Sequence, residues 1–223
     1  MADPPPPASP GGRVRVAVVD DDPFVLTALR SYLGSSERIE VAATFTSARD
    51  ALAFLRRVPV DVVLSDVRMP GTDGLELLDR LRRDQPGTAV VMLTSFDDDS
   101  AMRTALDKRA HGFLLKDSAP QDVVGAVLAA AAGGTTISPS VTSRLVSRHL
   151  RPVRASIRPD LTAAEQTVLT LLCEGLSNAE IAERLVVAES TVKTHVSSLM
   201  HKYGVASRLK LVVAVHRERD AQE

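Results

Sequence analysis

The chain has 223 residues, 44% of them hydrophobic, which is enough for one large or two small domains with substantial cores. Its formal net charge of −1 excludes a bulk attraction to nucleic acid, so any such binding must come from local charge asymmetry. A single cysteine, Cys173, excludes an intramolecular disulfide and fits a reducing compartment. The longest stretch of low polarity, 123–134, is shorter than the roughly 20 residues that cross a bilayer. We therefore expect a cytoplasmic protein without a membrane partner.

Residues 13–133 alternate apolar runs with amphipathic stretches, after a proline-rich segment, 1–12, that we expect to be a disordered leader. Strands that alternate with helices predict an α/β fold with a parallel sheet covered on both faces. Right-handed crossovers favour a doubly wound sheet, and for the strand order 2-1-3-4-5 its topological switch point lies between the first and third strands. The expected strands are 14–19, 39–43, 60–65, 89–94 and 112–115, and the expected helices are 23–33, 47–57, 74–83, 100–108 and 121–131.

Acidic residues follow two of the expected strands at the point where each strand ends. Asp20 and Asp21 follow the first strand, and Asp66 follows the third. In the expected strand order these two strands are neighbours beside the topological switch point, so the carboxylates meet at one edge of the sheet. Crowded carboxylates repel one another, which predicts a divalent cation among them. Thr94 and Lys116 end the fourth and fifth strands at this edge, and the whole set suits phosphoryl transfer to Asp66.

The second half of the chain changes character after residue 133. Segment 134–159 carries recurrent arginines and no acid, and we expect a basic linker in which 140–150 could form a helix. Residues 160–217 predict a small all-helical domain with a short tail, 218–223, and its first two helices begin with capping-box pairs. Acidic residues are confined to the first half of this domain, whereas the charged residues of 190–216 are all basic. This uneven distribution of charge suits a helix that enters the DNA major groove. The expected helices are 162–174, 178–185, 190–203 and 207–216.

Four motifs make residues 13–133 resemble a bacterial response-regulator receiver domain, which is flavodoxin-like. They are V-V-D-D-D-P-F at 18–24, S-D-V-R-M-P-G-T-D-G at 65–74, L-T-S at 93–95 and G-F-L-L-K-D at 112–117. The resemblance implies that a sensor histidine kinase phosphorylates Asp66, with Asp20 and Asp21 at a Mg²⁺ cofactor. It also implies that Thr94 and Phe113 form a switch pair, which repacks the surface around the fourth helix and fifth strand after phosphorylation.

Further motifs at 161–169, 175–185, 190–196 and 202–208 make the last domain resemble the LuxR/NarL-type helix-turn-helix. The resemblance implies a transcription regulator, not an enzyme, in which phosphorylation of Asp66 controls homodimer formation and sequence-specific DNA binding. It also places the dimer contact on the fourth helix, although its apolar residues could instead complete the domain core: Leu209, Leu211, Val212 and Val215. On the third helix we expect Lys193, Thr194 and Ser197 to face base edges, and Thr191, His195 and Lys202 to face phosphates.

Two residues depart from the pattern of the receiver family. Asp22 stands where relatives often have histidine and is expected to add negative charge beside the metal site. Arg109 stands where relatives usually have glycine, so a left-handed turn there would come at a cost. Arg68, two residues after Asp66, is expected to flank the phosphoryl pocket.

Two other readings of the first domain stay open. One is a phosphatase of the haloacid dehalogenase type, with Asp20 as nucleophile and Asp22 as its second acid. Pro23 and Phe24 argue against it, because that motif usually carries small and hydroxyl residues there. The other is a constitutive dimerisation module attached to the same DNA-binding domain, and the complete set of acids, Thr94 and Lys116 argues against that.

Overall fold

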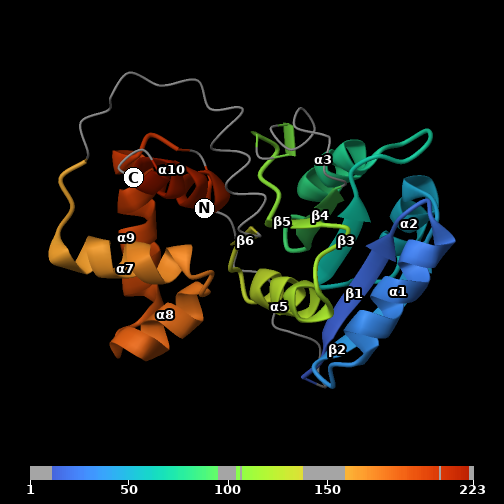
Figure 1. Ribbon diagram of the computed structural model, residues 1–223, viewed down its shortest axis with the longest axis horizontal. Helices are drawn as coiled ribbons and strands as arrows, with labels where there is room; N and C mark the ends of the chain where they lie inside the picture. Colours follow the sequence, from blue (N-terminus) through green and yellow to red (C-terminus); the bar gives the residue numbers. More distant parts are fainter. Residues whose placement is uncertain (1–11, 95–103, 106, 138–158, 206, 221–223) are drawn as a thin grey trace.

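The computed structural model describes residues 12–94, 104–105, 107–137, 159–205 and 207–220 (Figure 1). These residues form two units, a parallel sheet with helices on both faces and a group of four helices beside it (Figure 1). The described part of the chain contains no helix that is long and apolar enough to cross a membrane.

The sheet has the strand order β2-β1-β3-β4-β5-β6, and all its pairs are parallel. The first five strands have the predicted order. A sixth strand, which the sequence did not predict, pairs with β5 and lies in the segment expected to be a linker. It has only two residues, which is too short for an alternating pattern of apolar and polar residues to be recognised. The strands are β1 (Val14–Val19), β2 (Ile39–Phe45), β3 (Val62–Asp66), β4 (Ala89–Thr94), β5 (Gly112–Leu115) and β6 (Thr136–Ile137).

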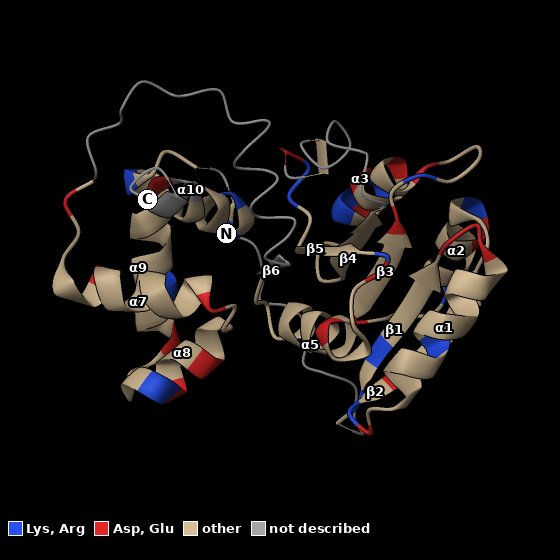
Figure 2. Ribbon diagram, in the orientation of Figure 1, with Lys and Arg blue, Asp and Glu red and all other residues tan. Residues whose placement is uncertain are grey.

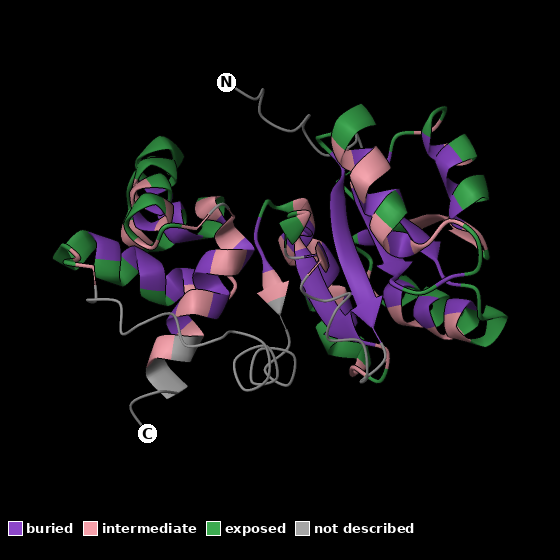
Figure 3. Ribbon diagram, turned by 90° about the horizontal axis from the view of Figure 1, so that it is seen from above, coloured by how far each residue is buried: buried purple, intermediate pink, exposed green. Residues whose placement is uncertain are grey.

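Helices cover both faces of the sheet because side chains alternate along each buried strand. In β1, Val16 and Val18 pack with α1 (Pro23–Gly34) and α5 (Pro120–Ala131). Ala17 and Val19 pack on the opposite face with α2 (Ala48–Leu55) and α3 (Gly74–Asp84). Figure 3 shows the strands buried between these layers. Of the predicted helix 100–108, residues 100–103 and 106 lie outside the described residues, as do 1–11 of the leader and the whole of the linker helix 140–150.

The second unit consists of α7 (Ala163–Cys173), α8 (Asn178–Leu185), α9 (Glu189–Lys202) and α10 (Arg208–Asp220). Both predicted capping boxes are present, at the start of α7 and of α8. The helix α10 continues beyond the predicted end at 216, because arginine and glutamate in its last residues favour a helix. Residues at helical spacing form the core, among them Ile181, Val192, Val196 and Leu199.

Candidate functional site

The structure brings the three predicted acids together at the carboxyl ends of β1 and β3. One carboxylate oxygen from each of Asp20, Asp21 and Asp66 lies within 4.8 Å of the other two. Asp20 is fully buried and Asp66 is 4% exposed, whereas Asp21 faces solvent. Carboxylate oxygens are the ligands that Mg²⁺ prefers, and the exposed Asp21 leaves the cluster open on one side. The donor set therefore fits a hydrated divalent cation.

Lys116 lies between the two buried acids. Its Nζ atom is 2.7 Å from Asp20 Oδ2 and 2.7 Å from Asp66 Oδ2. Burial raises the pKa of Asp66 above its ordinary value of 3.8, Lys116 opposes this, and the charge of Asp20 adds to it. Burial would lower the pKa of Lys116, but the two carboxylates outweigh that effect and raise it. The ammonium group therefore stays charged and holds the two acids together.

Neighbouring backbone groups fix the position of Asp66. The backbone N–H of Arg68 donates to Asp66 Oδ1 at 3.2 Å, and the Arg68 side chain is exposed beside the site. Gly74, at the start of α3, packs so closely that a Cβ atom there would lie 1.9 Å from the carbonyl oxygen of Asp66. Thr94 is buried, and its carbonyl accepts from the backbone N–H of Lys116 at 3.0 Å. The site is therefore built on four adjacent strand ends.

Asp22 lies beside the acidic cluster and has a structural role that was not predicted from the sequence. Its carboxylate accepts a hydrogen bond from the backbone N–H of Phe24 at 2.8 Å and caps α1, and it is not among the three clustered acids. An aspartate directly before a proline at a helix start is a common capping pattern, so the sequence did contain a signal for this role.

The expected cost at Arg109 is present. Arg109 has a φ of 59°, in the left-handed region that glycine adopts freely. Arg82 in α3 donates from Nη1 to the carbonyl oxygen of Arg109 at 3.1 Å. This bond holds the turn that leads into β5.

In the helical unit, α9 carries the residues predicted to contact DNA. Thr191, Lys193, Thr194 and Ser197 are exposed on it, and His195 is partly exposed. Figure 2 shows where basic and acidic residues lie along these helices. These side chains therefore lie on a helix whose opposite face is in the core, and Lys193 Nζ is 2.9 Å from Glu189 Oε1 on the same helix.

Lys202 already has partners within the domain. Its Nζ lies 2.7 Å from Glu165 Oε2 and 2.8 Å from the carbonyl oxygen of Asp160, so a DNA phosphate would be a further acceptor for this ammonium group. Ser198 donates to Glu165 Oε1 at 2.7 Å. These bonds, led by that of Lys202, lower the pKa of Glu165 to about 2. The sequence identified Glu165 only as a capping residue, because its partners on α9 are more than thirty positions away.

The turn before α9 is strained at Val186. This β-branched residue caps α8 with a φ of 54° and is 91% exposed, so its side chain gains nothing that offsets the left-handed backbone. We expect Val186→Gly to raise the free energy of unfolding by about 1 kcal/mol, measured by urea denaturation followed by circular dichroism. The control is Val187→Gly, because Val187 does not have a left-handed backbone conformation. An equal gain in stability in this variant would contradict the explanation.

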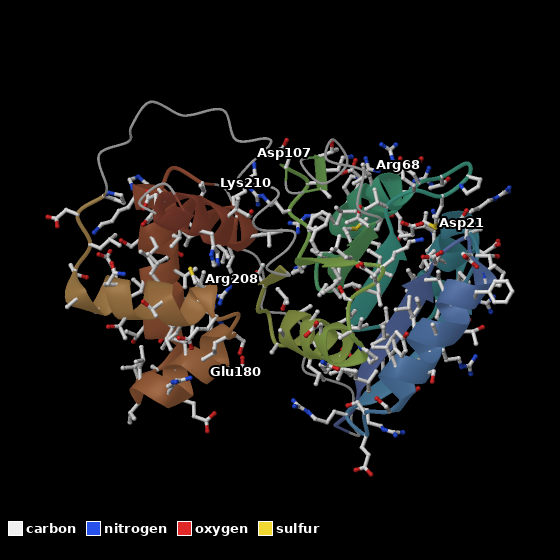
Figure 4. The ribbon with its side chains drawn as sticks, in the orientation of Figure 1. Asp21, Arg68, Asp107, Glu180, Arg208 and Lys210 are labelled. Atoms are coloured by element: carbon white, nitrogen blue, oxygen red, sulfur yellow. The ribbon has the colours of Figure 1, made fainter. Side chains whose placement is uncertain are left out.

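One side of α10 packs against the receiver rather than against its own unit. Leu209 is 1% exposed and Val213 is 3% exposed, and both belong to the hydrophobic cluster that contains the fully buried Phe113. Across the same contact, Lys210 Nζ lies 2.7 Å from Asp107 Oδ1 (Figure 4). The DNA-binding unit is thus docked on the receiver beside β5.

This packing bears on the four residues predicted for a dimer contact. Leu211, Val212 and Val215 are buried in the core of the helical unit, as the alternative reading expected. Leu209 is covered by the receiver. Any dimer that uses Leu209 therefore requires α10 to leave the receiver first.

Comparison with known proteins assigns each of the two structural units to a known family. The family of response regulator receiver domains matches residues 16–128. The luxR family of bacterial regulatory proteins matches residues 159–215. The chain is 34% identical to the nitrate/nitrite response regulator protein NarL of Escherichia coli K12, over 92% of this chain and 95% of that protein. The structure of the response regulator ChrA, from a heme-sensing two-component system, is 34% identical with a TM-score of 0.53, over 93% of this chain and 98% of that one. A complex of the response regulator RcsB with DNA is 28% identical with a TM-score of 0.56, over 92% and 98%.

The chain therefore belongs to the two-component response regulators that join a receiver domain to a LuxR-type DNA-binding domain. Proteins of this family bind DNA and regulate transcription under the control of receiver phosphorylation, and that is the function of this chain.

Proposed function

We propose that Asp66 is the phosphoryl acceptor of this regulator and that a sensor histidine kinase is the donor. The observation that carries the proposal is the cluster of Asp20, Asp21 and Asp66 with Lys116 held between its two buried acids. A carboxylate oxygen of Asp66 attacks the phosphorus of a phosphohistidine. The new P–O bond forms as the P–N bond breaks, and the kinase histidine keeps the electron pair and takes a proton.

The neighbouring side chains have separate roles in this proposal. Asp20, Asp21 and Asp66 would hold Mg²⁺, which supplies positive charge for the phosphoryl oxygens. Lys116 moves its ammonium from the Asp66 carboxylate to the new phosphoryl group, and Thr94 donates its hydroxyl proton to a phosphoryl oxygen. Thr94 is the last residue of β4, which pairs with β3 on one side and with β5 on the other. Phe113 lies in β5, so a small movement of Thr94 is passed to Phe113 through the pairing of these two strands.

The docked α10 gives phosphorylation a route to DNA. Phe113, Leu209 and Val213 share one hydrophobic cluster, so repacking around Phe113 disturbs the surface on which α10 lies. Release of α10 frees Leu209 for a homodimer, which presents two α9 helices to DNA half-sites about one helical turn apart. Lys193, Thr194 and Ser197 would then face base edges, with Thr191, His195 and Lys202 towards phosphates.

The test compares the wild type with Asp66→Asn, which keeps the shape of the side chain. With Mg²⁺ and beryllofluoride, the wild type should form more dimer and bind DNA about tenfold or more tightly than without them, by analytical ultracentrifugation and mobility shift. Asp66→Asn should show neither response and keep its basal DNA affinity. Asp84→Asn, an exposed acid at the end of α3, is the control and should respond as the wild type does. Equal responses in wild type and Asp66→Asn would refute the acceptor role, and unchanged DNA binding throughout would favour a constitutive dimerisation module.

A second prediction concerns the ion pair between the two units. Lys210→Glu places two acids in contact and should shift the population towards the undocked form a few-fold, because an exposed ion pair contributes about 1 kcal/mol or less. Small-angle X-ray scattering should report a larger radius of gyration. Adding Asp107→Lys restores opposite charges and should restore the compact form. A double variant as open as Lys210→Glu would show that this pair does not hold the units together.

A further inference from the structure

A basic hollow lies on the receiver between the end of α3 and the turn that leads into β5. It has a volume of about 390 Å³ and is lined by Asp79, Arg82, Arg83, Asp107, Lys108 and Arg109. In Figure 2 blue segments appear at one end of α3 and on the chain just before β5. The hollow is separate from the acidic cluster, which lies at the carboxyl ends of β1 and β3.

Both acids of the hollow are already neutralised. Asp79 is paired with Lys108, and Asp107 is paired with Lys210 of α10. Within the described part of the chain, Arg83 and Arg109 have no carboxylate at ion-pair distance, and Arg82 donates only to the carbonyl oxygen of Arg109. Among the described residues, guanidinium groups therefore gather at one place and neither Arg83 nor Arg109 has a carboxylate partner.

Arg82 and His111 lie close enough to other cations in this region for their pKa values to be affected. Burial lowers the pKa of Arg82, and the positive charge of Arg109 lowers it further. Burial, reinforced by the charge of Arg82, lowers the pKa of His111 to about 4. In both groups burial is the larger cause, and the neighbouring guanidinium group adds to it in the same direction.

The backbone contributes a second observation. Arg109 occupies a left-handed position at which glycine would avoid the steric cost, and Arg82 bonds to its carbonyl oxygen. The chain therefore holds a long cation at the rim of the hollow in spite of the strain. Arg82 and Arg83 lie in the last turn of α3, where positive charge interacts favourably with the helix dipole. That interaction explains neither the presence of Arg109 nor the hollow.

We propose that this hollow binds a small phosphorylated ligand, up to a nucleotide in size, through the guanidinium groups of Arg82, Arg83 and Arg109. Guanidinium groups bind phosphate oxygens in pairs, and the volume lies within the range of small-molecule sites. Binding removes the repulsion between Arg82 and Arg109. The ligand would sit beside Asp107, and so beside the contact with Lys210 that docks α10 (Figure 4).

The probe is inorganic pyrophosphate, added without Mg²⁺ to the full-length protein. Saturable shifts of backbone amide signals at 79–83 and 107–111 are expected, with affinity from calorimetry. Arg83→Gln and Arg109→Gly should each weaken binding about tenfold, because each removes charge-assisted hydrogen bonds. Arg109→Gly should at the same time raise the unfolding temperature, so its weaker binding cannot come from a damaged fold.

Arg30→Gln removes one exposed positive charge from α1 and is the matched control, with affinity expected to equal that of the wild type. The proposal is overturned if binding does not saturate at millimolar pyrophosphate or if the shifts fall on α9 instead. An equal loss of affinity in Arg30→Gln would also overturn it, because that result means attraction to net charge alone.

Discussion

Lys116→Met is expected to destabilise the receiver domain by roughly 3 kcal/mol, because it leaves two buried carboxylates facing each other without a cation. Asp20 is fully buried and Asp66 is 4% exposed, so solvent screens the repulsion between the two carboxylates only weakly. Urea denaturation of the full chain, followed by circular dichroism, measures the loss. The same variant should also lose the response to beryllofluoride.

The loss should depend on pH in a defined direction. Burial already raises the pKa of Asp66, and removing Lys116 removes the effects that oppose this rise. A carboxyl group whose folded pKa lies above its unfolded value destabilises the folded form when it is ionised, so the deficit is full at neutral pH. It should shrink as pH falls towards 3.8, the ordinary value for aspartate.

Lys108→Met is the control for this experiment. Its partner Asp79 is partly exposed, and the pair should contribute about 1 kcal/mol or less. A loss in Lys108→Met as large as that in Lys116→Met would contradict the role given to the buried pair.

Gly74→Ala is expected to cost about 2 to 3 kcal/mol, because its Cβ atom would lie 1.9 Å from the carbonyl oxygen of Asp66. Either α3 or the end of β3 must move, and Asp66 is the last residue of β3. We therefore expect slower phosphorylation from a small-molecule phosphodonor as well, measured as the phosphorylated fraction on a phosphate-affinity gel.

Gly125→Ala separates this effect from ordinary glycine substitution. Gly125 is exposed in α5, and nothing lies within 4 Å of a Cβ atom there. Alanine at that helical position should stabilise the protein by up to about 1 kcal/mol. The two variants are therefore expected to differ in sign, and a loss in both would contradict the proposed clash.

Much of the acidic site was predictable from the sequence. Asp20, Asp21 and Asp66 were expected to meet, since parallel strands bring their carboxyl ends to one edge, and the structure brings them together. Burial on α9 was predictable for the same kind of reason, because Val192 and Val196 follow the helical period.

Other contacts could not be predicted, because they join residues far apart in the sequence. Asp107 and Lys210 are 103 positions apart, and nothing near either residue indicates the other. Gly74 also depends on distance in space, because its need for a small residue comes from the carbonyl oxygen of Asp66.

The sequence by itself determined the two domains, their fold classes and the residues that gather at the acidic edge of the sheet. These follow from local periodicity and from the rule that parallel strands end on one side. Only the tertiary structure decided that Lys116 joins Asp20 to Asp66 and that α10 lies on the receiver. Those outcomes depend on burial and on which surfaces meet, and both arise only when distant segments pack together.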